Sequence, residues 1–302
     1  MPLDTLFLTS AAPAAKCMLF HGLVSSPKEF SVINNALKRD QVDILCPEIP
    51  GYTLQAGFGP ARWQDWLQHA LAAFDAEVAR SGPIMIGGLC IGALLALAIA
   101  RQRPGQVLGL ALLSPTLFYD GWGLSPWRKL RHIGYLPGLR NWIQIKEKPP
   151  FGIKNEQIRK WIAREMREQA LSGAGAAKLP LWAIHEAEKL IAHTMAQLSH
   201  IHAPTLILHA REDEVTSLRS PEYLMRQLAS THKQLIILNN SYHMITLDND
   251  RHRVVKALAD FIHPQKVPRN ENNPEHNSEH NPGHHQRPDS RQVWHQKSLV
   301  AG

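Results

Sequence analysis

Short, almost wholly apolar segments alternate with longer segments of helical periodicity along most of this chain, and this alternation limits the possible folds more than any other feature. The apolar runs cover residues 16–20, 42–46, 84–86, 107–113, 205–209 and 234–238. Apolar residues recur at helical spacing in residues 63–80, 93–101, 220–229 and 248–262. Because the short runs lack a polar face, we expect them to form a mostly parallel sheet with helices on both faces. The predicted fold class is α/β.

The composition predicts a globular protein with a sizeable core, since 44% of the 302 residues are hydrophobic and 20% are charged. The strand pattern lapses between residues 116 and about 200, where the sequence becomes basic, tryptophan-rich and helical. We expect residues 1–263 to form one domain, with residues 116–200 inserted into it as a helical cap. Residues 264–302 are rich in Asn, His and Pro, so we expect a disordered tail and assign it no function.

The formal charge of +7 is concentrated in the predicted cap. Residues 122–200 hold 13 Lys or Arg against 6 Asp or Glu, which accounts for the whole excess, together with five of the eight tryptophans. Basic and aromatic residues could grip single-stranded nucleic acid or settle at a membrane surface. No nucleic-acid-binding module is recognisable, so we favour an amphipathic segment that buries its tryptophans and exposes its charges. We predict no nucleic-acid partner.

Other features favour a cytoplasmic protein without stable membrane insertion. The longest nearly uncharged stretch, residues 87–100, is too short to cross a bilayer, and no basic segment precedes the first apolar residues as in a signal peptide. Cys17, Cys46 and Cys90 are too few for a disulfide framework, and none forms a metal-type pair. We therefore expect a reducing compartment and neither a metal nor a cofactor.

The strongest chemical signal is the motif Gly88-x-Cys90-x-Gly92 between an apolar strand and an apolar helix. A side chain on such a sharp turn is lifted clear of the sheet, and flanking glycines allow the strand and the helix to approach closely. The dipole of the following helix would favour a thiolate. Most free cysteines are simply small buried hydrophobes, but residues further along the chain favour a nucleophile here.

Two such residues follow later strands of the predicted sheet. Asp213 comes after the run at residues 205–209, and His243 comes after the run at residues 234–238. The order nucleophile, acid, histidine is that of the α/β-hydrolase triad. Glu212 or Glu214 could replace Asp213 as the acid, because one residue of register in a loop is beyond sequence reasoning.

A further motif, His21-Gly22-Leu23, follows the first apolar run. The backbone N–H groups of Leu23 and Ile91 would form an oxyanion hole, which is a pair of donors that stabilises negative charge on a reacting carbonyl oxygen.

At these residues the chain resembles the α/β-hydrolase superfamily, and within it the bacterial carboxylesterase and monoacylglycerol-lipase-like enzymes. The resemblance rests on the segments His21 to Pro27, Pro47 to Tyr52, Trp63 to Trp66 and Ser241 to Asp248. The chain departs from that family at the elbow, where the family has serine in place of Cys90 and glycine in place of Ala93. Cysteine at the elbow is similar to dienelactone hydrolases and polyhydroxyalkanoate synthases, but the former lack such an insertion and the latter are longer.

The resemblance and the motifs together predict a hydrolase of carboxylic esters or thioesters that forms a thioester acyl-enzyme on Cys90. A thioester is an activated acyl donor, so an acyltransferase is a second reading. In that case the basic cap could steer an anionic donor such as an acyl carrier protein or coenzyme A. A third reading is a binding module without catalysis, suggested only by the missing serine.

Overall fold

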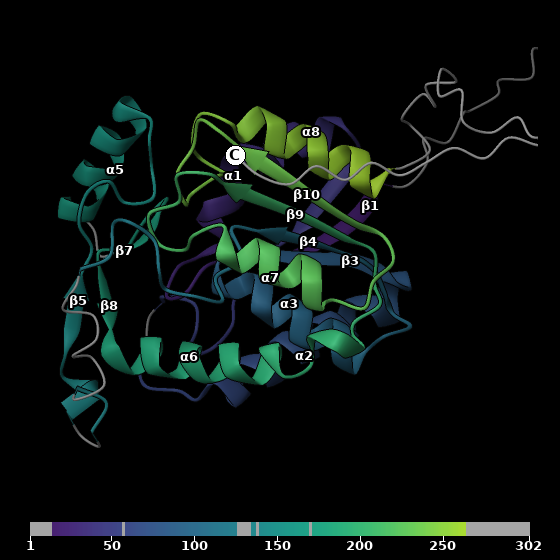
Figure 1. Cartoon of the computed structure of the whole chain (residues 1–302), viewed down its shortest axis with the longest axis horizontal. Helices are drawn as coiled ribbons and strands as arrows, with labels where there is room; N and C mark the ends of the chain where they lie inside the picture. Colours follow the sequence, from purple (N-terminus) through teal and green to yellow (C-terminus); the bar gives the residue numbers. More distant parts are fainter. Residues whose placement is uncertain (1–13, 56–57, 126–133, 137–138, 169–170, 264–302) are drawn as a thin grey trace, which may run out of the picture. The chain divides into compact units, whose positions relative to one another are not determined.

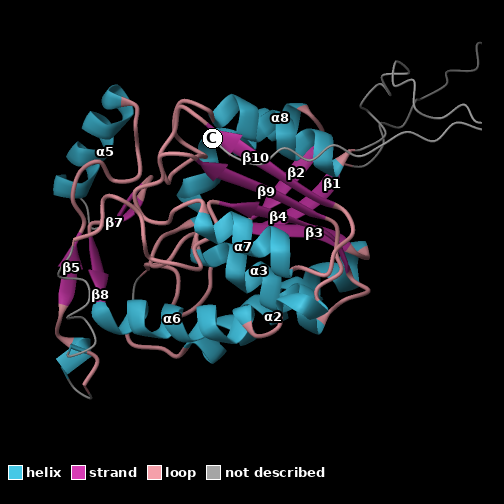
Figure 2. Ribbon diagram, in the orientation of Figure 1, coloured by secondary structure: helices cyan, strands magenta, loops and turns pink. Residues whose placement is uncertain are grey.

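The computed structural model describes residues 14–55, 58–125, 134–136, 139–168 and 171–263, which belong to one compact unit. Its centre is a sheet of six parallel strands in the order β10-β9-β4-β3-β1-β2 (Figure 1 and Figure 2). The strands are β1 (Ala15–Phe20), β2 (Val42–Leu45), β3 (Ile84–Leu89), β4 (Val107–Leu113), β9 (Thr205–Ala210) and β10 (Lys233–Leu238). Each corresponds to one of the six apolar runs, so the predicted α/β fold with a mostly parallel sheet is confirmed.

Helices cover both faces of this sheet (Figure 1). They are α1 (Ser31–Arg39), α2 (Trp63–Ser81), α3 (Ile91–Gln102), α7 (Arg219–Gln227) and α8 (Arg251–Ile262). Phe20 and Leu112 pack in a buried cluster with α2, α3 and α7, whereas the neighbouring Leu19 and Leu113 pack with α1 and α8. Successive side chains of a strand point to opposite faces, so two buried faces require strands without polar positions.

The first helix, α1, is absent from the sequence expectation. Only Ile33 and Leu37 of this short segment are buried, and two apolar residues one turn apart are a weak periodic signal. The last helix begins at Arg251 instead of residue 248, because the side chains of Asp248 and Asp250 bind backbone amides of the preceding loop.

In the part of the predicted insertion that the structure describes, short hairpins accompany the helices α5 and α6. Its elements are η3 (Leu139–Asn141), β5 (Gln144–Lys146), α5 (Glu156–Glu168), β6 (Leu171–Ser172), β7 (Gly175–Ala176), β8 (Lys178–Pro180) and α6 (Leu181–Met195). Strand β5 pairs antiparallel with β8, and β6 pairs antiparallel with β7. The 3-10 turn η4 (Leu198–His200) leads back to the sheet.

Helix α6 differs from the rest of the insertion because it packs against α2 and α3. Its residues Trp182 and Leu190 are buried in the same cluster as the core residues of those helices. The carboxylate of Glu186 also accepts a hydrogen bond of 3.2 Å from the backbone N–H of Trp63, the first residue of α2. The insertion therefore ends as part of the helical layer that covers the sheet.

The parallel arrangement brings the carboxyl ends of all six strands to one edge of the sheet. The loops after β1, β3, β9 and β10 start there and carry His21, Cys90, Asp213 and His243 respectively. Among the described helices, none combines the length and the apolar character that a membrane span requires. The tail expected at residues 264–302 lies outside the described residues.

Candidate active site

Cys90 occupies a strained turn between β3 and α3. Its backbone has φ 56° and ψ −118°, a region that residues other than glycine rarely adopt. The Cys90 N–H donates a 2.9 Å hydrogen bond to the carbonyl of Leu113 in the neighbouring strand β4, which fixes the turn to the sheet. A Cβ atom at Gly88 would clash with Gly92, and one at Gly92 would clash with the Phe20 carbonyl. The two glycines are thus required by the close approach of β1, β3 and α3.

The loops after β9 and β10 bring an acid and a histidine together. Asp213 Oδ2 lies 2.7 Å from His243 Nδ1, and both residues are buried. The other carboxylate oxygen, Asp213 Oδ1, accepts the backbone N–H groups of Val215 and Thr216 at 2.9 and 3.0 Å. The carboxylate is therefore held in place from within its own loop.

The pair favours a charged acid beside a basic imidazole. Burial alone would raise the pKa of Asp213, but His243 beside it outweighs burial, and the pKa lies below its ordinary value. Burial would likewise lower the pKa of His243, yet the Asp213 carboxylate, followed by Cys90, raises it well above the ordinary value. The pKa of Asp213 is lowered and that of His243 is raised because the charged carboxylate and the charged imidazole attract each other.

The two alternative acids of this loop have other partners. Glu212 forms an ion pair of 2.8 Å with Lys154 at the surface. Glu214 accepts the backbone N–H of His243 at 3.1 Å and does not contact its ring through a hydrogen bond. Of the three neighbouring acids, Asp213 is the one bonded to the imidazole.

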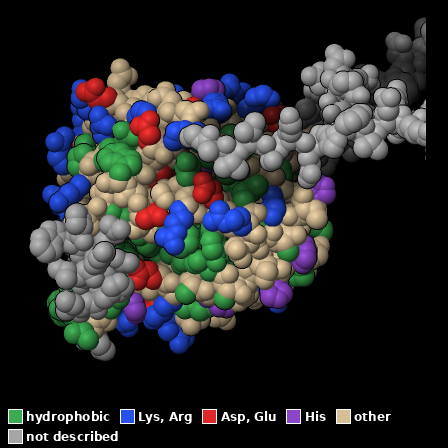
Figure 3. All heavy atoms as spheres, in the orientation of Figure 1, with side chains coloured by type: hydrophobic (Ala, Val, Ile, Leu, Met, Phe, Trp, Pro, Cys, Tyr) green, Lys and Arg blue, Asp and Glu red, His purple; other side chains and the backbone are tan. Residues whose placement is uncertain are grey.

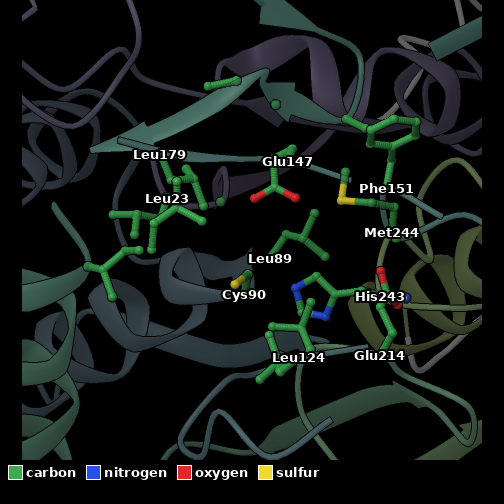
Figure 4. Close-up of a pocket in the computed structure, with 18 of the residues that line it drawn as sticks. Leu23, Leu89, Cys90, Leu124, Glu147, Phe151, Leu179, Glu214, His243 and Met244 are labelled. Atoms are coloured by element: carbon green, nitrogen blue, oxygen red, sulfur yellow. Dashed lines mark hydrogen bonds between the residues drawn. The ribbon is translucent and has the colours of Figure 1, made fainter. Parts of the chain in front are cut away.

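Three hydrogen bonds hold His243, to Asp213 at the ring, to Ser114 at the carbonyl and to Glu214 at the backbone N–H. Its second ring nitrogen, Nε2, has none of these partners. The Ser114 hydroxyl donates to the His243 carbonyl at 2.8 Å, while Glu214 accepts its N–H. The buried Nε2 atom has no hydrogen-bond partner among the described residues. Figure 4 shows the imidazole turned toward the Cys90 sulfur. The Cys90 Sγ atom itself lies 3.4 Å from the hydroxyl of Thr116.

The loop after β1 is fixed by buried polar contacts. The His21 ring binds the Gly22 carbonyl through Nδ1 and the Thr53 hydroxyl through Nε2, both at 2.8 Å. The Tyr52 hydroxyl donates to the His21 carbonyl at 2.8 Å. Burial lowers the pKa of His21 to about 4, so the ring is neutral at physiological pH. Leu23 lies next to this fixed segment and lines the same cavity as Cys90.

Ile91 is the other predicted oxyanion donor and begins helix α3. The N–H groups of a first helical turn have no acceptor within the helix. Leu23 lines the cavity that contains Cys90, and Ile91 directly follows Cys90 in the chain; their role as an oxyanion hole stays a prediction.

A cavity of about 440 Å³ lies above Cys90 and is mostly apolar. Its floor comes from the sheet edge and its walls from the insertion (Figure 4). The apolar lining residues include Leu23, Leu89, Leu124, Ile145, Phe151, Met166, Leu179, Ile184 and Met244. Such a cavity suits an apolar chain that reaches the sulfur.

Three carboxyl groups also line this cavity, and of these the sequence indicated only Glu214, as an alternative acid of the triad. Burial raises the pKa of Glu29 and of Glu147 to about 7, and it raises the pKa of Glu214. No lysine or arginine is among the described lining residues. Lys and Arg side chains instead gather over α5 on the surface, as Figure 3 shows.

The loop that carries His243 depends on the buried carboxylate of Asp248. It accepts the backbone N–H groups of Lys154, Asn155 and Tyr242 at 2.7 to 2.9 Å, and so ties this loop to the segment before α5. We expect Asp248→Ala to lower the free energy of unfolding by about 2 to 3 kcal/mol, because three partly buried donors lose their acceptor. Urea denaturation would measure the loss.

Asp260→Ala is the matched control, since among the described residues its carboxylate binds only the exposed Lys256 four residues away. It should cost about 0.5 kcal/mol or less. Equal losses in the two variants would contradict the role given to Asp248.

An α/β fold with a strained strand-to-helix elbow and an Asp-His pair from later strands defines the class of α/β-hydrolases. The family model described as serine aminopeptidase, S33, matches residues 11–250, and the chain belongs to this family. The elbow nevertheless carries cysteine in this chain. The prediction of an α/β-hydrolase of the lipase and esterase group is confirmed.

Characterised relatives are similar over most of their length. A thermostable monoacylglycerol lipase of Bacillus sp. (strain H-257) is 22% identical over 245 residues, which are 81% of this chain and 88% of the lipase. A carboxylesterase of Bacillus subtilis (strain 168) is 21% identical over 250 residues, 81% of this chain and 91% of the relative. Among solved structures, a soluble variant of the Saccharomyces cerevisiae monoglyceride lipase has a TM-score of 0.70 at 14% identity and covers 86% of this chain and 89% of its own.

Proposed function

We propose that this protein hydrolyses carboxylic esters with an apolar acyl chain, using Cys90 as the nucleophile. The observation that carries the proposal is the Asp213-His243 hydrogen bond of 2.7 Å beside a free imidazole Nε2 that faces the strained cysteine. The similarity to a monoacylglycerol lipase and a carboxylesterase supports an ester as the substrate class. The apolar cavity supports an acyl group that is chiefly hydrocarbon.

In the first half of the reaction, His243 Nε2 takes or already holds the proton of the Cys90 thiol as the sulfur attacks the carbonyl carbon of the ester. The carbonyl oxygen becomes an oxyanion, which the N–H groups of Leu23 and Ile91 stabilise. When the oxyanion collapses, the bond to the alcohol oxygen breaks. His243 returns the proton to that oxygen, which leaves the acyl group on sulfur as a thioester.

In the second half, water attacks the thioester while His243 accepts one of its protons. The tetrahedral intermediate then expels the Cys90 sulfur, which recovers its proton from His243. Asp213 orients the imidazole and stabilises its charged form throughout. The carboxylic acid is released, and the enzyme is restored.

Trapping the acyl group on Cys90 tests this proposal. The enzyme is mixed with a slowly hydrolysed activated ester, quenched in acid and digested, and the peptides are analysed by mass spectrometry. We expect a hydroxylamine-sensitive acyl group on the Cys90 peptide and none in Cys90→Ala. Burial raises the pKa of Cys17 to about 12 and also raises that of Cys46, so both thiols stay protonated and should remain unlabelled.

Cys46→Ala is the control and should label like the wild type. Acyl label on another residue, or steady turnover with no label on Cys90, would overturn the proposed nucleophile. Adding an alcohol or amine to the same reaction tests acyl transfer, because transfer to the added acceptor would then compete with hydrolysis. The described cavity has no cationic lining residue that supports binding of an anionic carrier, so an acyl carrier protein or coenzyme A stays a prediction from sequence.

A further inference from the structure

Glu29 is a buried acid beside the proposed nucleophile, and the reaction sequence above does not use it. It lies in the 3-10 turn η1 (Pro27–Phe30) and is only 2% exposed. Its carboxylate oxygen Oε2 accepts the backbone N–H of Gly22 at 2.7 Å. Because burying a carboxyl group is costly unless it is well bonded, its presence in an apolar cavity calls for an explanation.

The surroundings of Glu29 place it between the loop after β1, the elbow and the insertion. A Cβ atom built on Gly22 would lie 3.2 Å from Glu29 Oε1 and 3.7 Å from the Cβ atom of Cys90. A Cβ atom built on Gly175 in β7 would lie 3.7 Å from the same Glu29 oxygen. The Glu29 carboxyl group therefore contacts Gly22 in the loop after β1, and Gly22 in turn lies next to Cys90.

Gly22 needs such a partner because it has no side chain to restrict its backbone. The peptide between Gly22 and Leu23 is oriented by the His21 ring, which binds the Gly22 carbonyl. In a trans peptide the N–H points opposite to the carbonyl, so this contact turns the Leu23 N–H away from the His21 ring. The preceding peptide is held by Tyr52 at its carbonyl and by Glu29 at its N–H.

We propose that Glu29 is a positioning residue of the oxyanion hole, which holds the Gly22 N–H so that the Leu23 N–H faces the substrate carbonyl. The inference rests on the function proposed above. Without Glu29, the peptide between His21 and Gly22 keeps only its carbonyl contact, and rotation about the Gly22 backbone moves the Leu23 N–H. A hydrogen bond to a carboxyl group inside a poorly solvated cavity is stronger than one to water, which suits this task.

Comparing two reactions of the same sulfur tests the proposal. Acylation by an activated ester passes through an oxyanion, whereas alkylation by iodoacetamide displaces iodide from a saturated carbon and forms none. We expect Glu29→Ala to slow acylation of Cys90 by about 10- to 100-fold, up to the loss seen when an oxyanion donor is removed. The alkylation rate should stay within about two-fold, and the fall should appear in kcat more than in KM.

Two further variants separate positioning from loss of folding. Glu29→Gln keeps an oxygen that can accept the Gly22 N–H and should restore most of the acylation rate. Glu29→Asp withdraws the acceptor by one methylene group while keeping the charge, and it should slow acylation and leave alkylation unchanged even if Glu29→Ala fails to fold. Glu48→Gln removes an exposed carboxylate in a neighbouring loop and should change neither rate.

Equal slowing of both reactions by Glu29→Asp would overturn the proposal, because the residue would then act on the nucleophile. Unchanged acylation in Glu29→Ala and Glu29→Asp would overturn it as well. If wild-type Cys90 is alkylated but never acylated by esters, the proposed function fails before Glu29 is tested. The two failures are therefore distinguishable.

Discussion

Replacing Cys90 by alanine is expected to lower kcat for ester hydrolysis by about 10⁴-fold or more, the scale seen when a nucleophile is removed from a hydrolase triad. The reason is chemical: alanine has no atom that can form the acyl-enzyme, while the cavity and the oxyanion donors remain. Steady-state kinetics with a chromogenic ester would measure the loss. Binding of a non-hydrolysable analogue should change little, because the removed sulfur makes no ground-state contact that an apolar chain needs.

A second variant, Cys90→Ser, tests whether the site is adapted to a sulfur nucleophile. A serine hydroxyl is a weaker nucleophile at its ordinary pKa and depends more heavily on the histidine as base, so we expect most of the activity to be lost. A serine variant as active as the wild type would mean that the site is not adapted to sulfur. An alanine variant with unchanged turnover would rule out Cys90 as the nucleophile, and a wild type without any turnover would instead support the third interpretation of the sequence, a binding module.

Replacing Asp213 by asparagine is expected to lower kcat by about 10³- to 10⁴-fold, because the amide can bind the imidazole in the wrong tautomer and cannot stabilise its charge. Glu212→Gln is the matched control, since that neighbouring acid pairs with Lys154 at the surface and should leave kcat unchanged. Equal losses in the two variants would indicate a general effect on the loop.

The Asp213 variant should also change the pH dependence of stability. The pKa of His243 is raised in the folded protein, so its contribution is fully present below the ordinary histidine pKa of about 6.5 and is lost as pH rises through the folded value. In Asp213→Asn the pKa of His243 falls, and that contribution disappears. The difference in free energy of unfolding between the two proteins should therefore shrink as pH rises above about 6.5, and denaturation at several pH values would check this.

Residues at strand ends could be predicted from sequence because the parallel sheet itself gathers them. Cys90, Asp213 and His243 each follow an apolar run, and parallel strands end at one edge. Thr116, which contacts the Cys90 sulfur, follows the run at residues 107–113 in the same way, so its position near the site is also indicated by the strand end. The choice among the consecutive acids Glu212, Asp213 and Glu214 required the three-dimensional course of the loop after β9.

Glu29 and Glu147 could not be assigned to the site from sequence. Glu29 lies on a short 3-10 turn, and Glu147 lies in the insertion, where no strand end marks the place. Long-range packing alone brings them into the lining of the cavity above Cys90. Helix α1 was missed for a related reason, because its buried face consists of only Ile33 and Leu37. Where the local sequence pattern is weak, tertiary contacts determine whether a helix forms and where a side chain lies.

The two ends of the insertion offer different opportunities for protein engineering. A substitution of Ile145 in β5 alters the wall of the cavity and leaves both buried clusters of the core intact, whereas Ala176 of β7 belongs to one cluster and Met166 of α5 packs against the other. Changes in α6 reach both the cavity, through Ile184, and the packing against α2 and α3. Chain-length preference should therefore be adjustable from Ile145 in β5 at little expense in thermal stability, whereas redesign of α6 would alter both properties together.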